Sequence, residues 1–230
     1  MSLYFLVINL DKNVDRYSVL SESLKRLNCE FTRVRAINGF DMDNDDDAKK
    51  ILFERNDLLG KVFTCIETKK MWVYDGSVQK SFPNLQLLGH HGTKGLTLSN
   101  IKCFEIACQL NYDWFCVLED DSVMDAETLR KIKNFIKNQN NNKYDIVLLD
   151  DRDNGWGGTC AMLYNKRIVN KLQYHLHPLS KFSILSSKYG DKNFTNLWDW
   201  KLWKYVMYIN KNFTTLPCVK SGNFGSLINV

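Results

Sequence analysis

The sequence predicts an α/β fold with a mostly parallel central sheet flanked by helices, and three observations carry this prediction. The first is a strand, a helix and a strand in succession near the start of the chain, the pattern of a βαβ unit. The second is WFCVLEDD, from Trp114 to Asp121, a short apolar run of buried-strand character that ends in three acids. The third is the continued alternation of strand and helix patterns after that run.

The opening segment supplies the βαβ unit. Tyr4–Leu10 is an apolar run with strand character, and Phe31–Ile37 alternates apolar and basic residues as a second strand does. Between them, apolar residues at intervals of three and four positions predict one face of an amphipathic helix, formed by Tyr17, Leu20, Leu24 and Leu27. Elements so close together predict a parallel pair of strands joined by a right-handed crossover.

The middle of the chain is the least regular. The acidic run Asp41–Asp47 predicts a solvated loop or the start of a helix, and Ala48–Leu59 predicts a helix that Gly60 stops. Lys61–Thr93 is a long connection without a clear pattern, and loops of this length are usually functional or poorly ordered. Its neighbouring histidines, His90–His91, point to different sides and are expected to be exposed rather than to share a metal ion.

The second half of the chain has clearer patterns. Ser99 is placed to cap the helix that precedes the central strand, and Asp125 is placed to cap the helix that follows it. Pro217 lacks an amide hydrogen, so the last strand is expected at an edge of the sheet. The remaining elements expected are strands at Tyr144–Leu149, Thr159–Tyr164 and Phe213–Val219 and helices at Lys166–Leu176 and Leu197–Ile209.

Composition limits the classes of function. The 230 residues carry a net charge of +5 without a block of lysine or arginine, so a nucleic-acid partner is not expected. A weakly basic protein is compatible with an anionic substrate or with peripheral contact at an anionic membrane surface. Seven cysteines, without a CxxC pair, indicate reduced thiols and a cytoplasmic protein. The N-terminal apolar run is too short for a signal peptide or a transmembrane segment.

Three acids at the end of the central strand, Glu119, Asp120 and Asp121, carry the chemical argument. Like charges this close repel each other, and burial disfavours their ionised forms. A hard cation such as Mn²⁺ or Mg²⁺ neutralises such a cluster, and open α/β sheets bind ligands where their strands end. The cluster therefore predicts a divalent-metal site for a phosphate-bearing ligand, with a solvated acidic loop as the alternative.

Several stretches, taken in order, resemble one known family. VINLDKNVDRYSVLSESL and Ala36–Gly39 are similar to its INL…R start and its A-x-x-G element, and Gly95–Asn100 is similar to its G-C-x-x-S-H element. VLEDD, GGTCAMLYNKRIVNKL, TNLWDWKLW and SGNFGSLI are similar to its later elements. Over nearly its whole length the chain resembles glycosyltransferase family 25, the lipopolysaccharide and collagen glycosyltransferase group. It departs at Leu96, where the family often has Cys, and at Asn100, where the family usually has His.

This resemblance implies a GT-A-like fold, a Rossmann-type α/β sandwich, in a single domain over residues 1–230. Residues 1–121 would form the nucleotide-sugar-binding half and residues 122–230 the acceptor half. The implied metal ligands, of which Asp120 alternatively meets the ribose, are Glu119, Asp120 and Asp121. The nucleotide edge is expected to include Asn9, Leu10, Arg16 and Ser99. The Arg16 guanidinium suits phosphate oxygens, although a solvated helix arginine is an equal interpretation.

The implied activity is the transfer of a hexose, galactose or glucose, from a UDP-sugar to a glycan, glycolipid or glycoprotein acceptor, as in lipopolysaccharide biosynthesis. Mn²⁺ or Mg²⁺ is the implied cofactor. Inversion at the anomeric carbon needs a general base on the acceptor side. Asp199, in the element similar to the family's aspartate-bearing helix, and Asp151, at the end of a strand, are both candidates, and Asp150 competes with Asp151.

Two other classes of function fit the same acids. Phosphoryl transfer with two metal ions also uses carboxylates at the end of a strand, although no convincing set of further ligands accompanies them here. The second class is a glycosyltransferase-like domain that binds glycans or partners without turnover. The altered Gly95–Asn100 element keeps this interpretation open.

Overall fold

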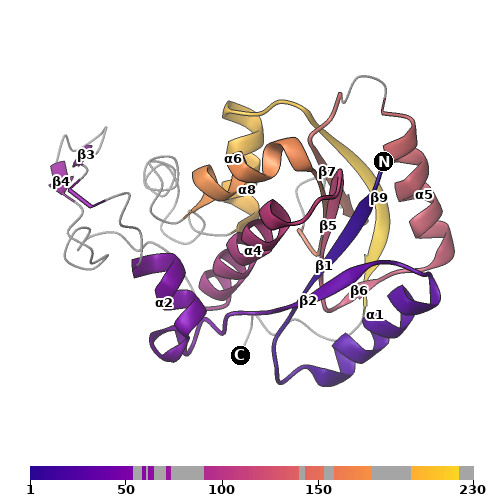
Figure 1. Cartoon of the computed structure of the whole chain (residues 1–230), viewed down its shortest axis with the longest axis horizontal. Helices are drawn as coiled ribbons and strands as arrows, with labels where there is room; N and C mark the ends of the chain where they lie inside the picture. The colour runs from indigo at the N-terminus through magenta and orange to yellow at the C-terminus, as the bar shows by residue number, and fades with distance from the viewer. Residues whose placement is uncertain are drawn as a thin grey trace.

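A computed structural model of the chain describes residues 1–53, 59–60, 62–64, 71–73, 91–139, 143–152, 158–177 and 198–222. Its centre is a seven-stranded sheet in the order β2-β1-β5-β8-β7-β9-β6 (Figure 1). The strands of this sheet are β1 (Leu3–Asn9), β2 (Phe31–Arg35), β5 (Trp114–Glu119), β6 (Ser122–Val123), β7 (Ile146–Asp150), β8 (Ala161–Asn165) and β9 (Phe213–Ser221).

The sheet is mixed in strand direction. β1 pairs in parallel with β2 and with β5, and β7 pairs in parallel with β9. β8 runs antiparallel to β5 and β7, and β6 runs antiparallel to β9. The predicted parallel βαβ unit is confirmed, whereas the whole sheet is less parallel than expected. Residues 151–160 are too few to carry a helical crossover, so the chain returns beside β7 in the antiparallel sense.

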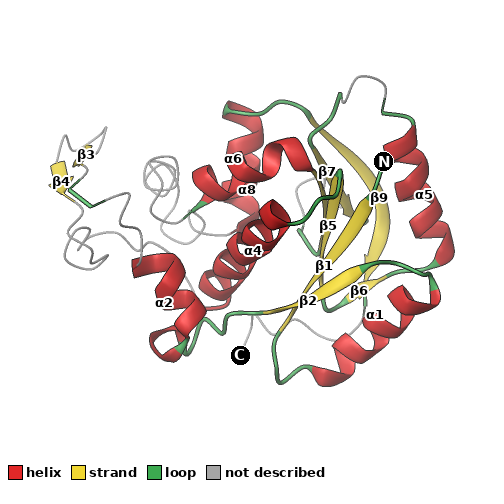
Figure 2. Cartoon of the chain, in the orientation of Figure 1, coloured by secondary structure: helices red, strands yellow, loops and turns green. Residues whose placement is uncertain are grey.

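Helices cover both faces of the sheet (Figures 1 and 2). One face carries α1 and α5, and the other carries α4, α6 and α8, with α2 packed beside α4. Their bounds are α1 (Val14–Arg26), α2 (Asp46–Phe53), α4 (His91–Gln109), α5 (Ala126–Lys137), α6 (Lys166–Leu176) and α8 (Trp198–Tyr208), with a short 3-10 turn, η1, at Met42–Asn44. β3 (Val62–Thr64) and β4 (Met71–Val73) form a separate antiparallel pair. Every helix that the structure describes falls short of the length and apolarity that a bilayer span requires.

Two hydrophobic cores lie on either side of the sheet, because alternate residues of a strand point to opposite faces. In β5, Phe115 and Val117 point into the core beneath α4, α6 and α8. Trp114, Cys116 and Leu118 point into the core beneath α1 and α5. The apolar run that ends in the acids is therefore a central strand buried on both faces, as predicted.

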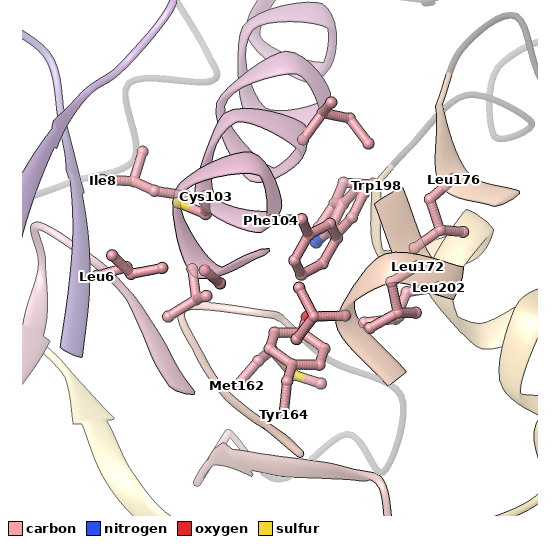
Figure 3. Close-up of a cluster of buried hydrophobic side chains, with 14 of the residues drawn as sticks. Leu6, Ile8, Cys103, Phe104, Met162, Tyr164, Leu172, Leu176, Trp198 and Leu202 are labelled. Carbon is pink, nitrogen blue, oxygen red and sulfur yellow. The ribbon is translucent and has the colours of Figure 1, made fainter. Parts of the chain in front are cut away.

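The core beneath α4 is organised around Phe104 (Figure 3). Its ring meets Tyr164 of β8 edge-on, with centroids 5.2 Å apart, and lies 6.0 Å from the ring of Trp198 in α8. All three side chains are fully buried. Truncation of a buried phenylalanine typically costs about 3–5 kcal/mol, so this aromatic cluster ties α4 and α8 firmly to the sheet.

Helix boundaries follow the predictions, with corrections at α2 and α4. α6 begins and ends where expected, and Asp125 caps α5 by accepting a hydrogen bond of 2.7 Å from the amide of Thr128. Ser99 does not cap a helix: α4 begins at His91, and the Ser99 hydroxyl donates to the carbonyl of Gly95 one turn earlier. A serine can donate to a backbone carbonyl within a helix as well as cap a helix start, so the residue type alone led to the wrong prediction of a cap.

The acidic run at residues 41–47 contains the 3-10 turn η1 and the first two residues of α2, so both the expected loop and the expected helix start are present. Three of its acids are paired: Arg35 donates to Asp45 and Asp47 at 2.8 Å, Lys102 of α4 donates to Asp47 at 2.5 Å, and Lys49 lies 3.7 Å from Asp46. These pairs join β2, α2 and α4. The helix expected over Ala48–Leu59 begins earlier, at Asp46, and residues 54–58 lie outside the described part of the chain.

β9 lies between β7 and β6 in the sheet order, so the edge position that Pro217 predicted is wrong. Its pairing with β7 shifts between Leu148 and Asp150, which face Thr215 and Val219, so Pro217 lies within the irregular stretch. On its other side, β9 meets β6 only at its last two residues. A proline without an amide hydrogen is tolerated in such a position.

Candidate functional site

A cavity of about 430 Å³ opens at the carboxyl ends of β1 and β5. This is the edge at which open α/β sheets bind ligands, and the volume is within the range of about 300–1,000 Å³ typical of small-molecule sites. Segments from both halves of the chain contribute to it. The described lining residues are Ile8, Leu10, Lys12, Asn13, Arg16, Ala36, Ile37, Asn38, Gly39, Phe40, Gly92, Gly95, Leu96, Ser99, Glu119, Asp120, Asp121, Arg152, Ser221 and Gly222.

Asp120 is held by the start of α1. Its Oδ2 accepts hydrogen bonds from Nδ2 of Asn9 at 2.8 Å and Nδ2 of Asn13 at 3.2 Å. Its Oδ1 lies 3.7 Å from a terminal nitrogen of Arg16, and both side chains are mostly buried. Arg33 donates to Oδ1 of Asn9 at 2.8 Å, which orients that amide toward the carboxylate. Asp120 thus fastens the end of β5 to the first turn of α1.

Asp121 has a different environment. Its Oδ2 accepts a hydrogen bond from the Ser221 hydroxyl at 2.9 Å, and its carbonyl accepts one from the amide of Gly222 at 2.6 Å. Its Oδ1 is buried and has no hydrogen-bond partner among the described residues. A buried carboxylate oxygen without a partner is costly, so this oxygen is ready to accept a cation or a donor group.

The three acids do not form a ready-made metal cage. Glu119 lies on the same face of β5 as Val117, opposite to Leu118, and lines the cavity. Within the described ranges, no group of three His, Cys, Asp or Glu side chains converges on one point. Mg²⁺ and similar hard cations are commonly held by one or two carboxylates together with substrate phosphates and waters. The unpaired oxygen of Asp121 fits such a partial site, and the well-bonded Asp120 fits it less.

The first turns of α4 form one wall of the cavity by close backbone packing. A Cβ atom on Gly39 would overlap the carbonyl of His91, and one on Gly95 would overlap the carbonyl of Ile37. The Ser99 hydroxyl, which donates to Gly95, also accepts a hydrogen bond from the amide of Ile37 at 2.9 Å. The loop after β2 and α4 can approach this closely only with glycine at both positions.

An exposed aromatic ring lies at the rim of the cavity. Phe40 is 62% exposed and stacks on the ring of His91, with centroids 4.6 Å apart and an interplanar angle of 21°. His91 is fixed in turn by a contact of 2.9 Å between its Nδ1 and the carbonyl of Gly39. His91 is exposed, as expected, but it starts a helix instead of lying in a loop; His90 lies outside the described residues.

Comparison with known proteins decides the family. The profile of glycosyltransferase family 25, described as an LPS biosynthesis protein, matches residues 3–209. The chain belongs to glycosyltransferase family 25. It is therefore a glycosyltransferase, as the ordered motifs predicted. No curated protein shows a significant sequence match to it.

The fold is also that of a known glycosyltransferase. A glycosyltransferase involved in the glycosylation of the major capsid of PBCV-1 is similar with a TM-score of 0.55 and 9% identity, covering 98% of this chain and 95% of that chain. This likeness confirms the GT-A-like α/β fold. Mouse xyloside xylosyltransferase 1 has a TM-score of 0.45 and 11% identity, with 97% of this chain and 98% of that chain covered, which is too low to support a shared fold.

The structure explains two of the family 25 elements in this chain. Gly39 of the A-x-x-G element and Gly95 of GLTLSN are the two glycines whose backbones pack together. Asn100, in place of the family His, is buried and donates to the carbonyl of Leu96 at 3.0 Å, and it is not among the described residues that line the cavity. These elements shape the wall of the site.

The structure brings most of the predicted site residues of this family 25 protein to one cavity. Those that line it are Leu10, Arg16, Ser99, Glu119, Asp120 and Asp121. Asn9 is buried behind Asp120 and orients it. The sequence analysis did not predict Phe40 and Arg152 as site residues, because neither belongs to a motif of catalytic or metal-binding residue types. The signal that could have identified them is their position beside elements similar to those of the family.

The candidate bases are placed less favourably. Asp151 is not among the described lining residues, and Asp199 belongs to α8, with its side chain outside the described part of the structure. Asp150 is no longer a candidate, because its side chain is fully buried and bonded to Arg152. Burial raises the pKa of Asp150, but hydrogen bonds from Arg152 and Cys160 outweigh this effect and hold the pKa below its ordinary value.

Proposed function

We propose that this family 25 glycosyltransferase transfers a hexose, galactose or glucose, from a UDP-sugar to a glycan or glycolipid acceptor with inversion, and that it depends on Mn²⁺ or Mg²⁺. The proposal rests on the environment of the Asp121 side chain. It lines the cavity at the carboxyl ends of β1 and β5 and keeps one buried carboxylate oxygen without a described partner. Such an oxygen suits a hard cation that also binds a diphosphate.

The charge in the cavity supports a cation together with an anionic donor. Three acids line it, and they are matched by three described cations: Lys12, Arg16 and Arg152. A diphosphate would add negative charge to a balanced site, and a divalent cation would offset that addition. When bound, the cation supplies Lewis-acid stabilisation of the departing diphosphate. Phe40, exposed at the rim, offers an aromatic face for the nucleobase or the sugar.

Glu119, Asp120 and Asp121 remain the proposed metal ligands, with Asp121 the principal one and Asp120 alternatively close to the ribose. Asn9, Leu10, Arg16 and Ser99 remain the proposed nucleotide edge. Residues 1–121 supply most of the described lining, while Arg152, Ser221 and Gly222 come from the second half. We propose that the donor lies between the two halves and that the acceptor enters from the side of residues 122–230.

The general base is proposed to be Asp199 or Asp151. The base removes the proton of the acceptor hydroxyl as that oxygen attacks the anomeric carbon. Replacement by Asn of the residue that serves as base should abolish transfer to the acceptor while leaving UDP affinity within about twofold of the unmodified protein. If both single variants transfer at the unmodified rate, neither residue is the base.

A reducing, cytoplasmic compartment is part of the proposal. All six cysteines in the described residues are free thiols. This is the state expected in the cytosol, where disulfides are rare. A glycolipid acceptor would bring the protein to a membrane surface through its substrate.

A UDP-release assay across nucleotide sugars, each with and without Mn²⁺, tests donor and metal together. UDP-galactose or UDP-glucose should give metal-dependent UDP release that an added glycan acceptor accelerates. Release of inorganic phosphate instead of UDP would favour phosphoryl transfer. Donor binding without turnover on any acceptor would favour a binding domain.

A further inference from the structure

Arg152 brings a fixed cation into the cavity from the second half of the chain. It follows β7 by two residues, its side chain is 46% exposed, and it lines the same cavity as Asp121. Its partner, Asp150, is the last residue of β7 and has a fully buried side chain. A carboxylate buried at the end of a strand is stable only when it is paired with a cation and hydrogen-bonded, and Arg152 is the cation that pairs with Asp150.

The pair holds the guanidinium in one orientation. Nε of Arg152 donates to both carboxylate oxygens of Asp150, at 2.9 Å and 3.0 Å, and Nη2 donates to Oδ2 at 2.5 Å. The amides of Arg152 and Cys160 donate to the same carboxylate at 3.1 Å and 3.3 Å. Asp150 is thereby saturated with donors. The side-chain hydrogen bonds from Arg152 to described residues use Nε and Nη2, which leaves Nη1 for a ligand, and the charge of Glu119 acts on the same guanidinium.

Gly158 closes the other side of this pair. Its φ angle is +48°, in the left-handed region, and a Cβ atom there would overlap both the Arg152 guanidinium and the Asp150 carboxylate. The guanidinium therefore packs directly on glycine backbone. Asp150 and Gly158 together fix the orientation of the Arg152 guanidinium.

We propose that Arg152 contacts the diphosphate of the nucleotide-sugar donor and that Asp150 is the positioning residue that aims it. This inference rests on the proposed function. A planar guanidinium fork matches phosphate oxygens, and an arginine whose orientation is already fixed loses little freedom on binding. Glu119 and Asp121 line the same cavity, so a neutral sugar hydroxyl would meet a site of mixed charge, whereas a diphosphate shared with a cation matches it.

The contact gains strength as the reaction proceeds. The acceptor oxygen forms a bond to the anomeric carbon while the bond from that carbon to the diphosphate oxygen breaks. The electron pair of the broken bond stays on UDP, and the acceptor proton passes to the general base. A fixed cation near the oxygen where charge accumulates stabilises that transition state without reorganisation.

The test compares three full-length variants by calorimetric titration with UDP and with uridine, in the presence of Mn²⁺. Arg152→Gln should weaken UDP binding by roughly 10- to 100-fold, the range expected for a hydrogen bond to a charged group, and leave uridine binding unchanged. The UDP affinity of Arg152→Lys should lie between those of Arg152→Gln and the unmodified protein, because lysine keeps the positive charge but lacks the planar guanidinium. Arg130→Gln, on the exposed face of α5 and paired with Glu127, is the matched control and should bind as the unmodified protein does.

Asp150→Asn tests the positioning role. It should lower the ratio of UDP affinity to uridine affinity, and it should have no further effect on that ratio when Arg152→Gln is already present. A purely structural role would instead weaken both ligands together, and that result would overturn the inference.

UDP binding by Arg152→Gln equal to that of the unmodified protein would also overturn the inference. If that variant does not fold, Arg152→Lys decides: UDP affinity equal to the unmodified protein would count against the contact. Failure of the unmodified protein to bind UDP with either Mn²⁺ or Mg²⁺ is a distinct result, since it overturns the proposed function and this inference with it.

Discussion

Asp120 and Asp121 are neighbours in the sequence, yet their side chains meet different partners. Asp120 is bonded to Asn9 and Asn13 and paired with Arg16, so it joins two elements of the fold. Asp121 is bonded to Ser221 through one oxygen and leaves the other without a described partner. The cluster of acids was predictable from the sequence. The division of roles was not, because the deciding partners lie about one hundred residues away in the chain.

This division predicts that truncating Asp120 destabilises the protein more than truncating Asp121 does. Asp120→Ala removes the carboxylate that accepts hydrogen bonds from Asn9 and Asn13 and pairs with Arg16, and it should lower the free energy of unfolding by about 1–3 kcal/mol. Asp121→Ala removes a poorly satisfied buried oxygen and should change that free energy by less than about 1 kcal/mol. Urea unfolding of the two variants beside the unmodified protein measures this difference. Equal losses of stability would show that the two acids are not distinguished in this way.

At the scale of elements, the site depends on how closely α4 approaches the loop after β2. The hydroxyl of Ser99 and the bare backbones of Gly39 and Gly95 permit that approach. The sequence indicated a helix here but misplaced its start, since a glycine-containing segment with a serine resembles a helix cap. Close packing between distant backbones leaves no local signal, so only the structure identifies the reason for these glycines.

Gly95→Ala therefore should destabilise the protein even though alanine is the better helix former. The propensity gain of about 1 kcal/mol is opposed by the overlap of the new Cβ with the carbonyl of Ile37. We expect a net lowering of the melting temperature together with weaker UDP binding, because α4 must move away from the cavity wall. Gly60→Ala is the control: its left-handed φ costs some stability, but nothing lies within 4 Å of the added carbon, so UDP binding should not change.

The ion pairs around Asp47 make the stability of the fold depend on pH. Lys102 and Arg35 donate to Asp47, and these hydrogen bonds hold the pKa of that carboxyl below its ordinary value against the opposing effect of burial. A carboxyl with a depressed pKa in the folded state contributes stability above its unfolded pKa, near 4, and loses it as the pH falls through the folded pKa.

Asp47→Asn should consequently be less stable than the unmodified protein at pH 7, and the difference should shrink as the pH is lowered below about 4. Because Asp47 is partly exposed, the effect should be small. Denaturant unfolding at a series of pH values measures it. A difference in stability that stays constant from neutral to acid pH would contradict the role given to this network.

In the whole molecule, the cavity is lined by residues from two parts of the chain that differ in topology. The first half is a parallel βαβ arrangement that β5 extends, and the periodicity of its residues predicted it correctly. The second half reverses direction at β8 and inserts β9 beside β7, which strand patterns cannot reveal because a pattern carries no pairing direction. Arg152 reaches the cavity through that second half, so its place in the site followed only from the topology.

We propose that Asp121 and a divalent cation together hold the diphosphate. Calorimetric titration of UDP with and without Mn²⁺ tests it most directly, because binding energies of coupled ligands are reciprocal. We predict that Mn²⁺ tightens UDP binding by about 5- to 150-fold in the unmodified protein, and that Asp121→Ala abolishes this enhancement while the remote Glu127→Gln retains it. UDP affinity that is the same with and without the cation, or an enhancement that survives in Asp121→Ala, would contradict the claim.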